Sequence, residues 1–259
     1  MDINKFDFEV KDQVAIITLN NPPLNIMTIE MLYDLQQLVL ECDKNEQIRV
    51  IIFTAAGEKV YTAGMNLDEM TGLDRNGLHE YLIGSRKVFS TFETVLKPII
   101  VAMKGIVRGG GLEMALSCDL RICSENTNFA LPEINVGIFP GGGGTQRLQR
   151  IIGQAKAKEL IYFGKVFNAE EAEKWGLVNK VVPNDQLLEE ALKWANELAE
   201  KSPIALSNVK DVIQIGAELD LKQALQYENY SFLDMFNTED RKEGIQAFKE
   251  KRKPIYQNR

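Results

Sequence analysis

The sequence predicts an α/β protein in which a layered core with parallel strands is followed by a helical last third. Two observations predict the core: a strand, a helix and a second strand follow one another in residues 14–54, and the same order returns in residues 97–125. A third predicts the change of architecture, because the patterns beyond residue 145 are almost wholly helical. With 259 residues, of which 45% are hydrophobic, the chain is long enough to bury a sizeable core.

The first unit begins with the β-branched run VAIITL at residues 14–19, which predicts a strand. Two prolines in the following NNPPLN end this pattern. Residues 28–42 place apolar side chains at helical spacing behind Thr28, a residue type that caps helices. The run RVIIFT at residues 49–54 predicts the second strand and completes a strand-helix-strand unit.

The second unit repeats this order without repeating the sequence. KPIIVAMKG at residues 97–105 predicts a strand, GGLEMALS a helix, and DLRICSE at residues 119–125 another strand. The segment between the units, residues 66–95, is mixed and partly helical. We expect the variable or substrate-dependent structure there, because functional variation concentrates in such connecting segments.

The last third contains one further strand signal, GLVNKVVP at residues 176–183, which ends at Pro183. Helical patterns occupy residues 185–201, 203–216, 220–236 and 239–252. We therefore expect a core domain over residues 1–195 and a helical region over residues 196–259.

Charge and composition exclude several classes of function. The net charge of −7 disfavours binding to nucleic acid or to an anionic membrane surface. No uncharged apolar run approaches the ~20 residues that span a bilayer. Residues 1–13, MDINKFDFEVKDQ, show neither a secretory signal nor an Arg-rich leader. We expect a cytoplasmic protein without nucleic-acid or membrane partners.

Cysteine and histidine usage points away from metal and triad chemistry. The three cysteines lie in apolar patterns that predict buried thiols rather than a disulfide framework. The single histidine, His79, lies in a polar helical pattern and is expected at the surface. Neither a zinc cluster nor a Ser-His-Asp site is therefore supported.

Three consecutive glycines open the predicted helix in RGGGLEMALSCD, residues 108–119. The dinucleotide fingerprint does not fit, because its third glycine would stand where Met114 stands, and PGGGGTQR lacks the Gly-Lys-Ser/Thr ending of a P-loop. Free N–H groups in the first turn of a helix instead suit a developing oxyanion. A second candidate donor lies in YTAGMNL, residues 61–67, where Ala63 and Gly64 leave the backbone accessible.

Four segments together resemble the crotonase superfamily, and within it the enoyl-CoA hydratases. They are YTAGMNL, KPIIVAMKGIVRGGGLEMALSCDLRI, FALPEINVGIFPGGGGTQRL and FGKVFNAEEAEKWGLVNKVV. The resemblance implies a crotonase-like spiral of repeated ββα units followed by a C-terminal helical trimerisation region, assembled as a homo-trimer or as a hexamer of two trimers. It also implies an acyl-CoA substrate whose thioester carbonyl accepts hydrogen bonds from the amides of Ala63 and Gly110.

Glu113 and Glu133 match the two glutamates of the hydratase motif. The resemblance implies reversible hydration of a trans-2-enoyl-CoA to a 3-hydroxyacyl-CoA, as in fatty-acid degradation, without a metal or redox cofactor. Such chemistry needs a base for the attacking water and an acid for the α-carbon. Glu133 is the better candidate for the proton at the α-carbon and Glu113 for the water, although closely coupled acids titrate as a pair and leave this division open.

The C-terminal segment AFKEKRK matches the family's CoA-binding helix, which implies that Phe248 packs near adenine and that Lys251 pairs with phosphate in a neighbouring subunit. Burial of Phe248 in an interface core is an equal alternative. Asn66 and Arg108 depart from the pattern, since many members have Asp and a small or apolar residue there. Asp119 and Arg121 are expected to be structural.

Two alternatives to hydration remain open at this point. One is a different acyl-CoA reaction on the same fold, such as double-bond isomerisation or dehydration of a specialised 3-hydroxyacyl-CoA. The other is RNA binding without catalysis, which some crotonase relatives show. The acidic balance and the lack of a dense basic run disfavour RNA binding.

Overall fold

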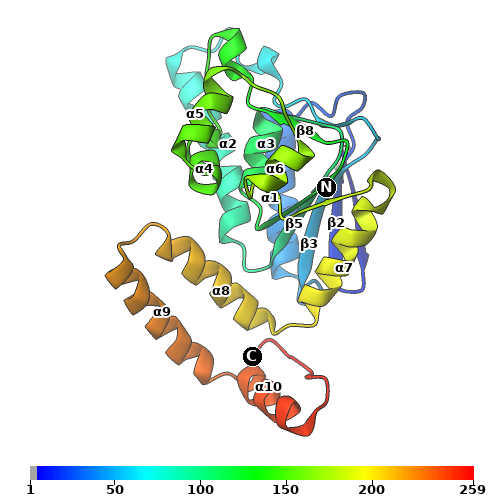
Figure 1. Cartoon of the computed structure of the whole chain (residues 1–259), viewed down its shortest axis with the longest axis vertical. Coiled ribbons are helices and arrows are strands. Elements are labelled where there is room, and N and C mark those ends of the chain that lie inside the picture. The colour runs from blue at the N-terminus through cyan, green and yellow to red at the C-terminus, as the bar shows by residue number, and fades with distance from the viewer. Residues whose placement is uncertain (1–4) are drawn as a thin grey trace.

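The computed structural model describes residues 5–259, and its main feature is a six-stranded sheet (Figure 1). In spatial order its strands are β1 (Phe6–Lys11), β2 (Val14–Leu19), β3 (Val50–Ala55), β5 (Ile99–Met103), β7 (Leu120–Ser124) and β10 (Lys180–Val182). All neighbours pair in parallel except β1, which runs antiparallel to β2 at the edge. The predicted parallel core is confirmed.

Both faces of the central strands β2, β3, β5 and β7 are buried, and successive residues of each strand point to opposite faces. Ile17, Ile51 and Val101 belong to the larger apolar cluster, which includes α1 (Ile29–Lys44). Ile16 and Ile52 belong to a second cluster, which α7 (Leu187–Ala199) closes on the other face. This double burial explains why the strands are continuous apolar runs.

The chain repeats a ββα unit whose first strand lies in the large sheet and whose second strand lies in a small sheet. The small sheet has the order β4 (Val60–Thr62), β6 (Ile106–Arg108), β8 (Asn128–Ala130) and β9 (Phe167–Asn168). In chain order β3 and β4 precede α2 (Arg75–Thr94), β5 and β6 precede α3 (Gly110–Leu116), and β7 and β8 precede α4 (Gly144–Ile152). The expected spiral of ββα units is confirmed, and the strand expected over residues 97–105 is β5, which ends at Met103.

Local signals placed the helices well. The Thr28 hydroxyl accepts a hydrogen bond from the Met31 N–H, so the predicted cap of α1 is present. The mixed segment at residues 66–95 contains η1 (Leu67–Glu69) and the long helix α2, on which His79 is exposed. The remaining short helices are η2 (Glu133–Val136), α5 (Gln154–Tyr162), α6 (Ala169–Lys174) and η3 (Asn184–Gln186).

Beyond α7 the chain leaves the core as three helices, α8 (Pro203–Gly216), α9 (Leu221–Phe236) and α10 (Glu239–Glu250) (Figure 1). The expected boundary after residue 195 lies inside α7, whose Ala199 still packs on the sheet. We therefore propose that the helical region begins after Ala199. None of the helices in residues 5–259 is long and apolar enough to cross a membrane, and the three cysteines are buried and unpaired.

Candidate active site

The glycines at the start of α3 are required by close contacts. Gly109 has φ +48° and ψ −125°, a backbone conformation that residues other than glycine rarely adopt. A Cβ on Gly109 would lie 3.0 Å from Glu133 Oε1, and a Cβ on Gly111 would lie 2.0 Å from the Thr62 methyl carbon. The three glycines thus let the chain turn tightly beside Glu133 while α3 packs against β4.

In the part of the chain that the structure describes, the backbone N–H groups of Met65 and Gly110 are both free and lie close together. Within residues 5–259, neither the Gly110 nor the Met65 N–H donates to an acceptor of the chain. A Cβ placed on Gly110 would lie 3.7 Å from the Met65 nitrogen, which shows how near the two amides are. The Ala63 N–H instead donates to the Leu24 carbonyl at 2.9 Å. The expectation of a free amide at Ala63 is therefore wrong, and the free amide of this loop belongs to Met65.

Glu113 is almost fully buried in the first turn of α3. Its Oε1 accepts a hydrogen bond of 2.8 Å from the Gly144 N–H, and the Gly142–Gly144 turn wraps its carboxylate so closely that a Cβ on Gly142 would lie 2.7 Å from Oε2. Burial raises the pKa of Glu113, whereas the hydrogen bonds from this turn and the positive charge of Arg147 oppose the rise.

Glu133 follows Pro132 and opens η2, which carries its carboxyl group to the same opening. Its Oε2 is buried and receives no hydrogen bond from the described part of the chain. Burial first, and the charge of Glu113 second, raise the pKa of Glu133 to about 7. Burial thus raises the pKa of both carboxyl groups, and they differ in their hydrogen bonds: Glu113 accepts from the turn, whereas Glu133 Oε2 has no donor within residues 5–259.

The free amides and the two glutamates line one cavity of about 310 Å³. Its remaining wall is mainly apolar and comes from η1, α2 and the loop after Glu133, through Leu67, Met70, Tyr81, Leu82, Phe89, Val136, Ile138 and Phe139. A neighbouring cavity of about 760 Å³ shares several of these residues. Part of the predicted variable segment thus forms one side of the candidate site.

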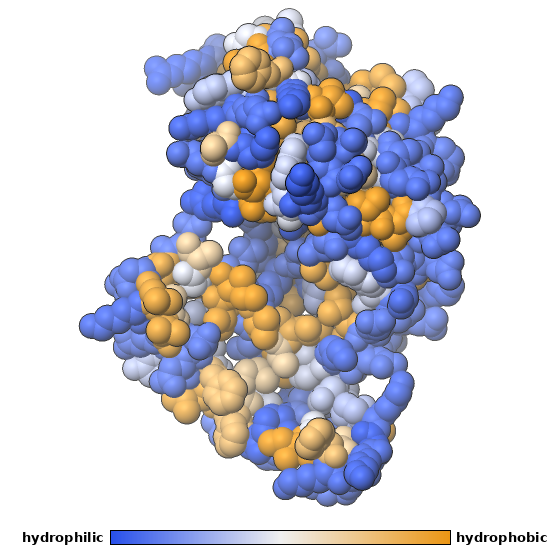
Figure 2. All heavy atoms as spheres, in the orientation of Figure 1, coloured by the Kyte–Doolittle hydropathy of each residue, from blue (hydrophilic) through white to orange (hydrophobic). Residues whose placement is uncertain are grey.

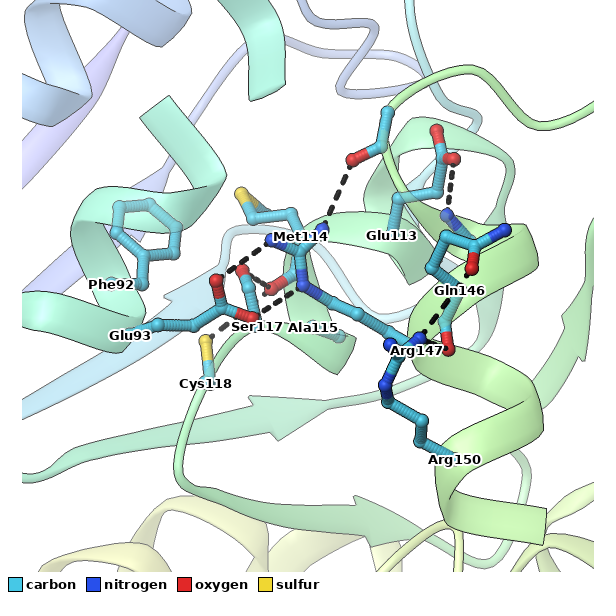
Figure 3. Close-up of polar contacts among 12 residues, drawn as sticks. Phe92, Glu93, Glu113, Met114, Ala115, Ser117, Cys118, Gln146, Arg147 and Arg150 are labelled. Carbon is cyan, nitrogen blue, oxygen red and sulfur yellow. Dashed lines mark hydrogen bonds and ion pairs between the residues drawn. The ribbon is translucent and has the colours of Figure 1, made fainter. Parts of the chain in front are cut away.

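The sequence analysis missed an ion pair behind Glu113. Arg147 of α4 contacts Glu93 of α2 through two bonds, Nε to Oε1 at 2.5 Å and Nη2 to Oε2 at 2.9 Å (Figure 3). Its Nη1 also donates to the Gly142 carbonyl at 3.1 Å. The signal that could have found Arg147 was its position at the end of PGGGGTQR; nothing in the sequence indicated Glu93.

Phe248 and Lys251 are not near this cavity within one chain. Phe248 is 85% exposed on α10, and Lys251 follows as the left-handed cap of that helix. Figure 1 shows α10 at the end of the helical extension, well away from α3. Their expected contact with CoA would therefore have to involve the site of a neighbouring subunit.

The residues that depart from the family pattern have structural contacts. The Asn66 side chain accepts from the Asp68 N–H and caps η1. Arg108 donates to the carbonyls of Val107 and Asn128 at 3.1 Å and 2.8 Å and also to the Asn128 side chain, so its contacts are structural.

The charged residues after α3, Asp119 and Arg121, also have structural contacts, but they are not paired with each other. Asp119 accepts from Lys210 at 2.9 Å and from the Ile99 N–H at 2.7 Å. Arg121 donates to the carbonyls of Leu177 and Cys118, each at 2.7 Å. Asp119 therefore joins the core to α8, and Arg121 fixes the loop before β10.

Comparison with known proteins finds relatives that match nearly the whole chain. A family model described as enoyl-CoA hydratase/isomerase matches residues 9–259. The chain is 39% identical over 254 residues to the short-chain-enoyl-CoA hydratase of Clostridium acetobutylicum, covering 98% of this chain and 97% of the relative. It is 37% identical to the crotonyl-CoA hydratase of Syntrophomonas wolfei, with 95% of each covered. The solved enoyl-CoA hydratase from Bacillus anthracis matches with a TM-score of 0.94 and 38% identity, over 98% of this chain and 100% of that chain.

Proposed function

Because the chain belongs to the enoyl-CoA hydratase/isomerase family, we propose that it catalyses the reversible addition of water to a trans-2-enoyl-CoA, which gives a 3-hydroxyacyl-CoA. The observation that carries this proposal is the meeting of two differently hydrogen-bonded glutamates, Glu113 buried and Glu133 half-buried, with two free amides in one cavity. Short acyl chains are the first substrates to test, since the relatives in C. acetobutylicum and S. wolfei are named for them.

The amides of Met65 and Gly110 are the proposed oxyanion hole. The thioester carbonyl oxygen would accept from both N–H groups, which polarises the conjugated double bond and stabilises the enolate that forms on attack. Met65 replaces Ala63 in this role because the Ala63 N–H is already bonded to Leu24. The position of Gly110 is unchanged from the expectation.

The two glutamates would divide the proton transfers. Water held by ionised Glu113 forms the C–O bond at the β-carbon and gives its proton to that carboxylate, while the π electrons of the double bond move to the thioester oxygen. The α-carbon then takes the proton of Glu133 and the carbonyl reforms. Glu133 is suited to deliver this proton because its pKa, about 7, keeps it partly protonated at neutral pH. Return of one proton from Glu113 to Glu133 restores the pair.

We also propose that the helical region assembles the chain into a trimer or a hexamer. No residue of α8 or α9 is buried in the single chain, and Figure 2 shows apolar side chains gathered over these helices. They include Val209, Ile213, Leu225, Phe232 and Phe236. Such assembly is what would bring Phe248 and Lys251 to the CoA of a neighbouring subunit. Light scattering on the protein as it elutes from a size-exclusion column measures its molar mass and so tests this assembly. The molar mass of a monomer at micromolar concentration would contradict it.

The test of the reaction is the loss of conjugated-thioester absorbance when the protein meets crotonyl-CoA. Glu113→Gln and Glu133→Gln should each lower the rate about 10²- to 10⁴-fold. Glu197→Gln, which removes an exposed glutamate of α7, is the matched control and should leave it unchanged. No loss of absorbance with the parent protein, for short or long enoyl chains, would reject hydration. Conversion of a 3-enoyl-CoA to the 2-enoyl isomer without hydration would favour isomerisation instead.

A further inference from the structure

The Gly142–Gly144 turn, which binds Glu113, is itself bound by Arg147 on its other side. Gly142–Gly144 has no side chains of its own, and Gly143 adopts a left-handed φ of +115°. The Arg147 guanidinium occupies the space beside it, because a Cβ on Gly143 would lie 2.1 Å from Nη1. Arg147 Nη1 donates to the Gly142 carbonyl, and the Gly144 N–H donates to Glu113 on the opposite side of the same turn.

Glu93 fixes the direction of that guanidinium. The bidentate contact between Arg147 and Glu93 joins the last turn of α2 to the first turn of α4, and the two side chains are only 15% and 26% exposed. A planar guanidinium can bind a carboxylate with two N–H groups and still offer a third to a carbonyl, which an ammonium on a flexible stem does not reproduce. Figure 3 shows Arg147 between Glu93 and the Glu113 side of the site.

We infer that Arg147 and Glu93 are positioning residues: together they fix the Gly142–Gly144 turn on the Glu113 carboxylate, so that the N–H groups of the turn favour its ionised form. The inference rests on the proposed hydration and adds to it the two residues that position Glu113. Neither residue lines the cavity. They act on the substrate only through the turn and Glu113.

The charges around Glu113 agree with this assignment. The ionisable groups that act on it are Glu133 from η2 and Arg147 from α4, with Glu93 of α2 behind Arg147. Burial raises the pKa of Glu113, and the N–H groups of the turn and the charge of Arg147 act against that rise. Glu133 has no comparable donor in the described chain except its own backbone. The two carboxyl groups therefore differ in their hydrogen-bond donors, which favour the ionised form of Glu113.

Three variants test the inference. Arg147→Lys keeps the positive charge but loses the planar guanidinium that binds Glu93 and the Gly142 carbonyl together. The kcat for crotonyl-CoA should therefore fall about 10- to 100-fold, while KM changes less than about threefold. The acid limb of its pH–rate profile should move to higher pH, because the donors no longer hold Glu113 ionised. Glu93→Gln keeps the guanidinium and removes the charge that offsets it, so the acid limb should move to lower pH. Arg150→Lys, one turn along α4 and exposed, is the matched control and should behave as the parent.

Crystal structures of the variants give a readout that does not depend on turnover. In Arg147→Lys the Gly142–Gly144 turn should shift and the 2.8 Å contact between the Gly144 nitrogen and Glu113 should lengthen, with no change in Arg150→Lys. An unmoved turn, or kcat and acid limb equal to those of the Arg150→Lys control, would overturn the inference. If the parent does not hydrate any enoyl-CoA, the proposed function fails, and an unmoved turn in Arg147→Lys would then reject the positioning role by itself.

Discussion

Replacing Glu133 with glutamine should make the protein more stable at alkaline pH while removing its activity. In the folded chain the pKa of Glu133 is raised from 4.5 to about 7, chiefly by burial. Between these values the folded state binds more protons than the unfolded state, so the contribution of Glu133 to stability becomes unfavourable as pH rises through this window. Glutamine does not ionise and avoids that cost. The variant and the parent should therefore differ little below pH 4.5 and most above pH 7.

The size of the effect follows from the same rise. At about 1.4 kcal/mol per pH unit, a rise from 4.5 to about 7 corresponds to about 3 kcal/mol for full ionisation. Solvent reaches part of this half-buried side chain and screens its charge, which lowers the expected gain to about 1–2 kcal/mol. For a chain of this size that gain raises the melting temperature by about 2–8 °C.

Thermal unfolding at about pH 5 and about pH 8, at one protein concentration, measures the difference. Glu197→Gln controls for the loss of one negative charge at an exposed position. The reasoning is refuted if Glu133→Gln melts no higher than the parent at the alkaline pH. It is also refuted if the gain is the same at both pH values, because a gain that ignores pH does not come from ionisation of Glu133.

Three further predictions concern other parts of the molecule. Gly110→Ala would bring a Cβ to 2.6 Å from the Met65 side chain, so we expect hydration to fall about 10²- to 10³-fold in the absorbance assay as the two amides separate. Lys210→Met leaves Asp119 unpaired against the core, and urea unfolding should show a loss of about 2–4 kcal/mol. Phe248→Ala should raise KM for crotonyl-CoA about tenfold with little change in kcat, measured by steady-state kinetics.

Each of these has a control. Gly216→Ala has only a contact of 3.7 Å to accommodate and should keep its activity. Lys193→Met removes an exposed lysine, 60% accessible in its side chain, and should not change the free energy of unfolding. The Phe248→Ala protein should process a crotonyl thioester without the nucleotide as well as the parent does. A KM raised equally for both thioesters would contradict the proposed adenine contact.

The large sheet could be predicted from the sequence because strands buried on both faces appear as continuous apolar runs. The crotonase fold that the motifs implied is confirmed by the structure and by the match to the B. anthracis enzyme. The edge strand β1 was missed because Phe6–Lys11 alternates apolar and charged residues on the exposed edge. The strands of the small sheet were missed because they are two or three residues long and carry too little pattern.

At the site, the motif predicted which residues line the cavity but not which hydrogen bonds they make. The spacing of Glu113 and Glu133 led to both carboxyl groups of the cavity. Ala63 was taken from the family resemblance, in a loop of small residues. Whether an N–H is free depends on which carbonyl the folded loop presents to it, and only the structure shows the Leu24 carbonyl there. Glu93 was missed for a similar reason, since its partner Arg147 lies 54 residues away.

The amides of Met65 and Gly110 belong to the main chain, and this has an evolutionary consequence. No exchange of one side chain for another deletes a backbone N–H, apart from a change to proline. The codons of Glu113 and Glu133, in contrast, are each one nucleotide change from a codon for glutamine, lysine, glycine or aspartate. A descendant of this chain could therefore lose one reaction and acquire another in few steps while keeping the groups proposed to activate a thioester. The durable element of such a site is a geometry of the backbone, and the side chains around it are free to diverge.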